Sequence, residues 1–69
     1  MVRVSVAMAV YNGEAYLKEQ LDSVLQQLGK KDELIISDDG STDQTIPIIE
    51  AYKKKDPRIR LIFGQGRGI

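Results

Sequence analysis

Apolar runs alternate with stretches of helical spacing along the chain, and together they predict five elements. Residues Arg3–Val10 are rich in valine and apolar at both alternating positions, as in a strand that is covered on both faces. Between Glu14 and Leu28, apolar side chains recur every three or four residues, which predicts an amphipathic helix. The apolar stripe of this helix comprises Leu17, Leu21, Val24, Leu25 and Leu28.

The second half of the chain repeats this alternation. Residues Glu33–Ser37 predict a second strand, and Arg60–Phe63 predict a third. The helix between them follows an acidic turn and runs to about Lys55. Proline breaks a helix interior, so Pro47 must lie in the first turn, with Thr45 as the N-cap. The stripe of this helix comprises Ile46, Ile49, Tyr52 and the apolar stem of Lys53.

Turn residues mark the ends of the predicted elements. Asn12 and Gly13 precede the first helix as cap candidates, and Gly29 ends it. Asp56-Pro57 is expected to end the second helix, and residues 64–68 are expected to form a flexible, glycine-rich end. The order strand–helix–strand–helix–strand predicts an α/β fold with parallel strands and right-handed crossovers.

Composition and charge exclude several classes of protein. The chain has 69 residues, so it forms one small domain at most. Ten basic and ten acidic residues cancel, which argues against a nucleic-acid-binding protein. Cysteine and histidine are both absent, so disulfides, thiolate chemistry and the commonest general base are excluded. No apolar stretch approaches the about 20 residues of a membrane span, and no signal peptide is evident. We therefore expect a cytoplasmic or membrane-peripheral location.

The predicted sheet is incomplete. Parallel sheets rarely stop at three strands, so residues 1–69 are expected to be a single partial domain cut from a longer one. The valine-rich first strand then forms an exposed edge, and we expect such a chain to self-associate through it.

Side chains that could bind a ligand lie where two predicted strands end. Tyr11 follows the first strand, and Asp38 and Asp39 follow the second. In open α/β sheets, ligands bind outside the carboxyl ends of the strands. Two adjacent acids repel each other beside a buried strand, so a ligand is the better explanation for at least one of them. An aromatic ring next to a carboxylate predicts a pocket for a flat, polar ligand.

Known motifs for other chemistries do not fit this turn. A haloacid-dehalogenase phosphatase needs Asp-x-Asp-Gly-Thr, but Ser37 stands where its first aspartate should be. An EF-hand loop counted from Asp38 would need an acid at Ile49. A Walker A loop is absent, and the glycines of residues 64–68 follow the third strand rather than the first. A capped turn explains Gly40 and the polar residues after it, but it leaves Asp39 unexplained.

Taken together, these motifs resemble the family 2 glycosyltransferases of GT-A fold. The sequences EQLDS (19–23) and ISDD (36–39) are similar to those of the rhamnosyltransferase-like branch. The resemblance covers nearly the whole chain. It implies a β-α-β-α-β parallel sheet that forms the N-terminal half of a Rossmann-like, nucleotide-sugar-binding domain. The matching segments are VSVAMAVYNGE (4–14), YL (16–17), LDSVLQQ (21–27), ELIISDDGSTD (33–43) and DPRI (56–59).

The resemblance also implies roles for single residues. The family's strand-end aromatic, here Tyr11, packs on the pyrimidine of a nucleotide-sugar donor, and its second acid, here Asp39, accepts a hydrogen bond from the base. Uracil and thymine carry a ring N–H that a carboxylate accepts in a charge-assisted bond, whereas adenine and cytosine do not. Guanine also carries one and stays open. The candidate nucleotide-binding residues are Ala9, Tyr11, Glu14, Asp38 and Asp39.

Parts of the family's machinery are missing from this sequence. The metal-binding Asp-x-Asp and the catalytic base of the family follow later strands, so we expect no catalytic residue and no metal ligand within the chain. The resemblance implies a full-length enzyme that uses Mg²⁺ or Mn²⁺ and transfers a sugar from a UDP- or dTDP-type donor. Its acceptor would be a hydroxyl of a glycan or lipid-linked molecule in polysaccharide or cell-envelope synthesis. We expect these 69 residues alone to be inactive.

Other classes stay open beside this one. A non-catalytic nucleotide-binding or interaction module would need no missing segment. A different α/β enzyme, such as a nucleotidyltransferase, would need a basic or glycine-rich phosphate loop after the first strand, and Tyr11–Glu14 is too acidic for that. A structural fragment that binds no ligand is the remaining possibility.

Overall fold

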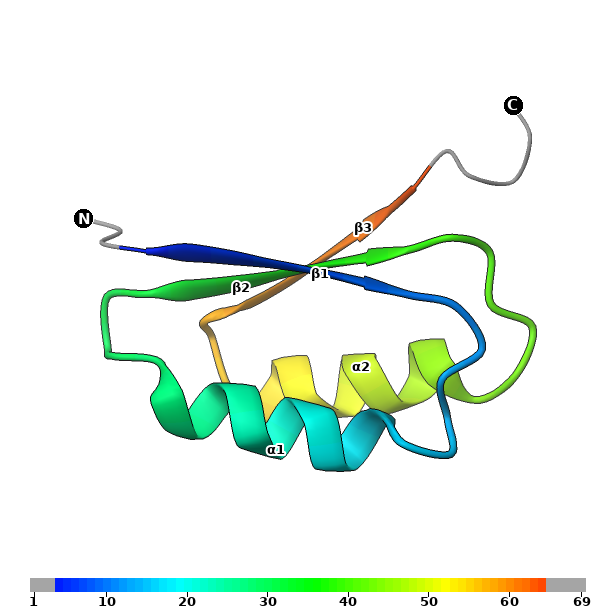
Figure 1. Ribbon diagram of the computed structural model, residues 1–69, viewed down its shortest axis with the longest axis horizontal. Coiled ribbons are helices and arrows are strands. Elements are labelled where there is room, and N and C mark those ends of the chain that lie inside the picture. Colours follow the sequence, from blue (N-terminus) through cyan, green and yellow to red (C-terminus); the bar gives the residue numbers. More distant parts are fainter. Residues whose placement is uncertain (1–3, 65–69) are drawn as a thin grey trace.

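The computed structural model describes residues 4–64 and contains three strands and two helices in the predicted order (Figure 1). The predicted α/β class is therefore confirmed. Most boundaries agree with the sequence pattern to within one or two residues, and the start of the first helix differs most. The elements are β1 (Ser5–Val10), α1 (Leu17–Gln27), β2 (Glu33–Asp38), α2 (Thr45–Lys55) and β3 (Ile59–Phe63).

The three strands form one parallel sheet in the order β1-β2-β3, as predicted. Both helices lie on the same face of this sheet (Figure 1). The prediction that β1 is covered on both faces is wrong for the part of the chain that the structure describes. Ser5, Ala7 and Ala9 are exposed, while Val6, Met8 and Val10 are turned towards the helices. Because β2 is central, β1 is an edge strand, as expected.

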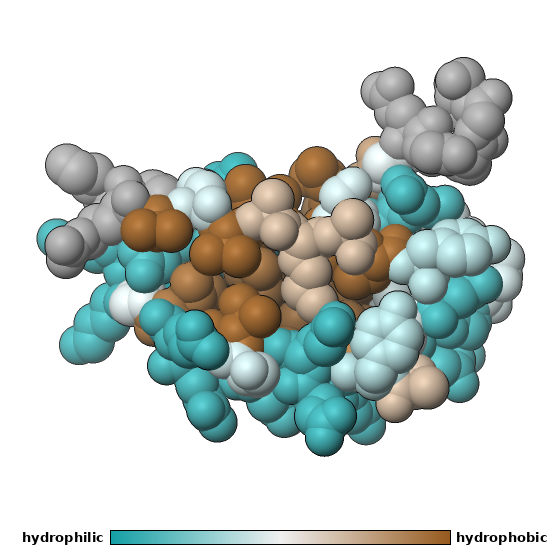
Figure 2. All heavy atoms as spheres, in the orientation of Figure 1, coloured by the Kyte–Doolittle hydropathy of each residue, from teal (hydrophilic) through white to brown (hydrophobic). Residues whose placement is uncertain are grey.

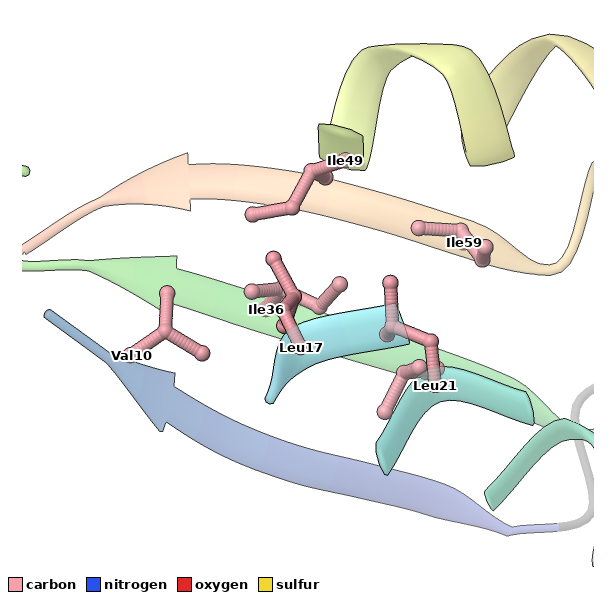
Figure 3. Close-up of a cluster of buried hydrophobic side chains, with 7 residues drawn as sticks. Val10, Leu17, Leu21, Ile36, Ile49 and Ile59 are labelled. Atoms are coloured by element: carbon pink, nitrogen blue, oxygen red, sulfur yellow. The ribbon is translucent and has the colours of Figure 1, made fainter. Parts of the chain in front are cut away.

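The hydrophobic core lies between the sheet and the two helices (Figure 3). Leu17 of α1 lies over Ile36 of β2, and Leu21 of α1 and Ile49 of α2 belong to the same cluster. All four side chains are fully buried. The predicted stripe of α1 is confirmed, since Leu17 and Leu21 are in the core and the rest of the stripe packs against it. The predicted stripe of α2 is right for Ile49 and Tyr52 but wrong for Ile46, because Ile48 packs against the core in its place. The buried apolar residues of the core are Val10, Leu17, Leu21, Leu34, Ile36, Ile49 and Ile59.

Helix α1 begins three residues later than predicted and is capped differently. Its N-cap is Tyr16, without a side-chain cap, and the carbonyl of Gly13 accepts the N–H groups of Tyr16 and Leu17. Asn12 and Gly13 are therefore not its caps. The helix ends at Gln27, before Gly29. An arginine that is distant in the sequence binds the carbonyl groups at this end. The Arg58 guanidinium donates to the carbonyls of Leu25, Leu28 and Gly29.

Helix α2 agrees more closely with its prediction. Pro47 is its third residue, in the first turn where no intrahelical N–H is needed. Its N-cap is Gln44 rather than Thr45, and Asp56 ends it as predicted. Strand β2 continues one residue further, to Asp38. Of the predicted flexible end, only Gly64 belongs to the described residues.

Candidate functional site

Two loops meet at the carboxyl edge of the sheet, and hydrogen bonds join them. One loop follows β1 (residues 11–16) and the other follows β2 (residues 39–44). The Asn12 N–H donates to the Ser41 hydroxyl at 2.8 Å, and the Thr42 N–H donates back to the Asn12 amide oxygen at 2.8 Å. Asn12 has a φ of 47°, a left-handed conformation that asparagine tolerates better than most residues. This pairing fixes the path of the chain directly after Tyr11.

The same loops are joined at a second level, near the start of α2. The Gly13 N–H donates to the Thr45 hydroxyl at 2.8 Å, and the Glu14 N–H donates to Asp43 at 3.2 Å. In return, the Gln44 N–H donates to the Glu14 carboxylate at 2.7 Å. Thr45 is buried and donates its hydroxyl to Asp43. We call this set of bonds between residues 12–14 and 41–45 the loop clasp.

Asp38 points towards the helices and closes the turn after β2. Only 1% of its surface is exposed. One carboxylate oxygen accepts the N–H groups of Gly40 and Ser41, each at 2.9 Å, and the other accepts the Ser41 hydroxyl. Gly40 has a φ of 98°, which favours glycine at this point of the turn. Both oxygens of Asp38 are thus used within the fold.

These bonds decide the charge of Asp38. Burial raises the pKa of its carboxyl group, but the hydrogen bonds from Ser41 and Gly40 outweigh this effect and hold the pKa below the ordinary value. The pKa of Asp43 is lowered in the same way: burial raises it, and the donors of Thr45 and Glu14 more than compensate. The carboxylates of Asp38 and Asp43 are therefore stabilised in their ionised form by N–H and O–H donors.

Asp39, the neighbour of Asp38, lies on the other face of the sheet. Its N–H donates to the Val10 carbonyl at 3.1 Å, which ties it to the end of β1. Its half-buried carboxylate accepts no hydrogen bond from residues 4–64, and it lies beside Gly64 at the end of β3. The fold therefore directs two acids that are adjacent in the sequence into different surroundings.

Of the remaining candidates, Tyr11 and Ala9 lie on the same side as this carboxylate, and Glu14 does not. Val10 and Asp38 are register partners, so Tyr11 and Asp39 follow paired positions of neighbouring strands. Tyr11 is 57% exposed, and Ala9 is exposed on the uncovered face of the sheet. Glu14 lies on the helix side, in the loop clasp, and its carboxylate is engaged with the N–H of Gln44. The structure thus places Ala9, Tyr11 and Asp39 at one edge, buries Asp38 and engages the exposed Glu14 in the loop clasp.

Two residues near Asp39 were not singled out from the sequence. Ser37 shares its face of β2, because side chains alternate along a strand. Gly64 follows Phe63, the register partner of Asp38, so it lies across from Asp39. The alternation of side chains along β2 could have indicated Ser37, whereas Gly64 follows only from the register between β2 and β3.

The described residues do not form a metal site. No group of three or more acidic side chains in residues 4–64 is placed to hold a metal ion. The oxygens of Asp38 are already occupied by backbone and hydroxyl donors. A charged hollow of about 440 Å³, lined by Lys30, Lys31 and Arg60 among others, lies at the opposite, amino ends of the strands. Neither helix in residues 4–64 has the length and apolarity needed to cross a membrane.

Comparison with known proteins assigns the family. A glycosyltransferase from Haemophilus influenzae is 46% identical over 63 residues, which cover 91% of this chain and 25% of that protein. The dTDP-rhamnosyl transferase RfbG of Shigella flexneri is 44% identical over 52 residues, which cover 75% of this chain and 18% of RfbG. The chain therefore spans a quarter or less of these relatives.

Solved structures and family models agree with these relatives. The crystal structure of residues 1–349 of S. aureus TarS matches with a TM-score of 0.79 and 33% identity, covering 93% of this chain and 19% of the TarS chain. The model of glycosyl transferase family 2 matches residues 5–69. The strand ends with Tyr11 and Asp39, the parallel sheet and these matches lead to one conclusion: the chain belongs to glycosyl transferase family 2.

Proposed function

We propose that the chain supplies the base-recognition part of an enzyme that transfers a sugar from a UDP- or dTDP-type donor to a hydroxyl group. The acceptor would be a glycan or lipid-linked molecule of polysaccharide or cell-envelope synthesis. Family membership supports sugar transfer, and the name of the relative RfbG supports a dTDP-linked donor. Residues 1–69 would be one partial domain, and the reaction would take place on the cytoplasmic side, at or near the membrane.

One observation supports this proposal above all. Of the four acids at the carboxyl edge of the sheet, Asp39 alone accepts no hydrogen bond from residues 4–64. Asp38, Asp43 and Glu14 all accept hydrogen bonds within the fold. Asp39 accepts none from residues 4–64, yet its backbone is fixed to the end of β1. A carboxylate held in place without a donor is suited to the ring N–H of uracil or thymine.

The other candidates serve this contact in different ways. The exposed ring of Tyr11 offers a flat surface on which the base can stack. Ala9 has a small side chain on the uncovered face, which leaves room beside the base. Asp38 and Glu14 act indirectly, because they hold the two loops that present Tyr11 and Asp39.

The metal ligands and the catalytic residues for sugar transfer would come from other parts of the enzyme. A divalent cation, Mg²⁺ or Mn²⁺, would neutralise the diphosphate leaving group, and its ligands would come from outside the described residues, which offer no fitting site. These 69 residues alone are expected to be inactive. A non-catalytic nucleotide-binding module is the second candidate, because the same carboxylate and ring would serve it equally well.

Nucleotide titration of an Asp39→Asn variant tests the proposal. Loss of the charge-assisted bond should weaken UDP and dTDP binding by about tenfold or more and leave the weaker binding of CDP unchanged. Isothermal calorimetry gives the affinities, and amide NMR shows whether Tyr11 and Asp39 respond. Glu19→Gln, an exposed acid of α1, is the matched control. Equal UDP affinity in Asp39→Asn and the parent protein would remove Asp39 from the site.

The free edge of β1 supports the proposal that the isolated chain self-associates. Val4 is 52% exposed, and a groove of about 410 Å³ lined by Met8 and Val24, among others, runs between β1 and α1. Figure 2 shows apolar side chains exposed over this strip. Sedimentation of the 69-residue chain should show concentration-dependent association, and Ala7→Lys should reduce it. A monomer at high concentration would contradict the proposal.

A further inference from the structure

Gly64 lies closer to a functional side chain than any residue with a Cβ could. A Cβ built on Gly64 would lie 2.2 Å from a carboxylate oxygen of Asp39 and 3.0 Å from the Ser37 hydroxyl oxygen. Non-bonded carbon and oxygen atoms do not approach to 2.2 Å, so one of them would have to move. At Gly29, by comparison, the nearest atom to such a Cβ is an Asp32 oxygen at 3.3 Å.

The requirement for glycine at this position is one of space rather than backbone conformation. Gly40 is the glycine with a positive φ among the described residues, and Gly64 is not. The φ of position 64 therefore does not itself require glycine. The Gly64 N–H also donates to the Asp38 carbonyl at 2.7 Å, which fixes this backbone against β2. Relief from an added Cβ would have to come from the Asp39 side chain.

We propose that Gly64 is a positioning residue for the donor base: its missing side chain makes the space in which the Asp39 carboxylate lies. The inference rests on the proposed function, because it assigns Gly64 a role in the same base contact. It extends the site from the ends of β1 and β2 to the end of β3. It also assigns a role to a glycine that, from the sequence, belongs to the glycine-rich segment 64–68.

A methyl group at position 64 should act on Asp39 in a defined way. The Asp39 backbone is tied to the Val10 carbonyl, so its carboxylate can yield mainly by turning to another rotamer. Such a turn moves the oxygens by more than the few tenths of an ångström that a hydrogen bond tolerates. The ring N–H of uracil would then lose its acceptor, although the ring of Tyr11 would still be available for stacking.

The experiment measures UDP and CDP affinity in the full-length protein and in its Gly64→Ala variant. CDP carries the same diphosphate and a pyrimidine ring, but its ring nitrogen has no hydrogen for Asp39 to accept. Gly64→Ala should weaken UDP binding by about tenfold and leave CDP binding within about twofold, so the preference for UDP disappears. Gly29→Ala, at the opposite end of the sheet, is the matched control and should keep the preference.

A double variant separates a role in positioning from a general loss of structure. If the added methyl acts through Asp39, Gly64→Ala should cost no further UDP affinity in an Asp39→Ala background. Should Gly64→Ala fail to fold, Asp39→Ala/Gly64→Ala should fold, because the clashing oxygen is gone. A double variant that also fails to fold would overturn the inference.

The outcomes also distinguish this inference from the function on which it rests. A parent protein without any preference for UDP over CDP would refute the base contact of Asp39, and with it both proposals. A parent protein that prefers UDP, together with a Gly64→Ala variant that keeps the preference, would refute only the role of Gly64. Equal losses of UDP and CDP binding in Gly64→Ala would also refute it, because they would show general damage to the site.

Discussion

The two faces of the sheet serve different purposes, and strand β2 shows this residue by residue. Leu34, Ile36 and Asp38 point towards the helices and are buried. Ile35, Ser37 and Asp39 point the other way, where no described element covers them. The covered face contains the core and the acid that closes the turn. The uncovered face contains Asp39, the acid that we propose binds the base.

Burial therefore separates two adjacent aspartates that look alike in the sequence. Asp38 is surrounded by donors and stabilises the fold, whereas Asp39 has an anchored backbone and a carboxylate without a donor among residues 4–64. A difference of one position along a strand changes the face, and hence the role, of a side chain. Variants on the two faces should accordingly affect different measurements.

The largest expected contrast compares two neighbouring isoleucines of β2. Ile36 is fully buried, so Ile36→Ala should destabilise the fold by about 4 kcal/mol, through lost burial and a cavity. Ile35 is half-buried on the uncovered face, and Ile35→Ala should cost about 1 kcal/mol. Urea denaturation followed by circular dichroism gives both values. Equal losses would show that the uncovered face is packed in solution.

The second contrast compares the two aspartates. Asp38→Ala leaves the N–H groups of Gly40 and Ser41 and the Ser41 hydroxyl without their acceptor, so it should cost about 3 kcal/mol. Asp39→Ala removes no such bond and should change stability by no more than about 0.5 kcal/mol. The same denaturation experiment measures both. If Asp39→Ala proved as damaging as Asp38→Ala, the assignment of roles to the two faces would be wrong.

The smallest expected effect is the dependence of stability on pH. The pKa of Asp38 is lower in the folded chain than its ordinary value of 3.8. Its contribution is therefore fully present above the unfolded pKa and is lost as the pH falls through the folded pKa. Unfolding free energies measured from about pH 6 down to about pH 2 should decline over this range. Asp38→Asn cannot titrate and should show a shallower decline; identical pH profiles would contradict the pKa shift.

Much of the fold could be predicted from the sequence, because its elements follow from local patterns. The stripe that includes Leu17 and Leu21 predicts α1, and valine enrichment predicts β1. The start of α1 could not be predicted, since Asn12 and Glu14 bond to a loop about 30 positions away rather than to the helix. Local cap rules contain no information on such partners.

The candidate site could be predicted only in part, for a related reason. The positions of Tyr11 and Asp39 at neighbouring strand ends could be predicted, because both residues directly follow apolar strands. The different roles of Asp38 and Asp39 depend on which face the helices cover, which the sequence does not state. The close approach of Gly64 to Asp39 depends on the register between β2 and β3. Both are properties of the assembled sheet.

The loop clasp has a consequence for synthesis on the ribosome. Its bonds join residues that are 29 to 32 positions apart, and its last partner is Thr45. Such non-local contacts form late, after the chain between them has been ordered. A nascent chain emerges N-terminus first, so Tyr11 leaves the exit tunnel well before the segment that holds its loop in place. During translation, the edge with Tyr11 and Asp39 is thus completed only once α2 begins to emerge.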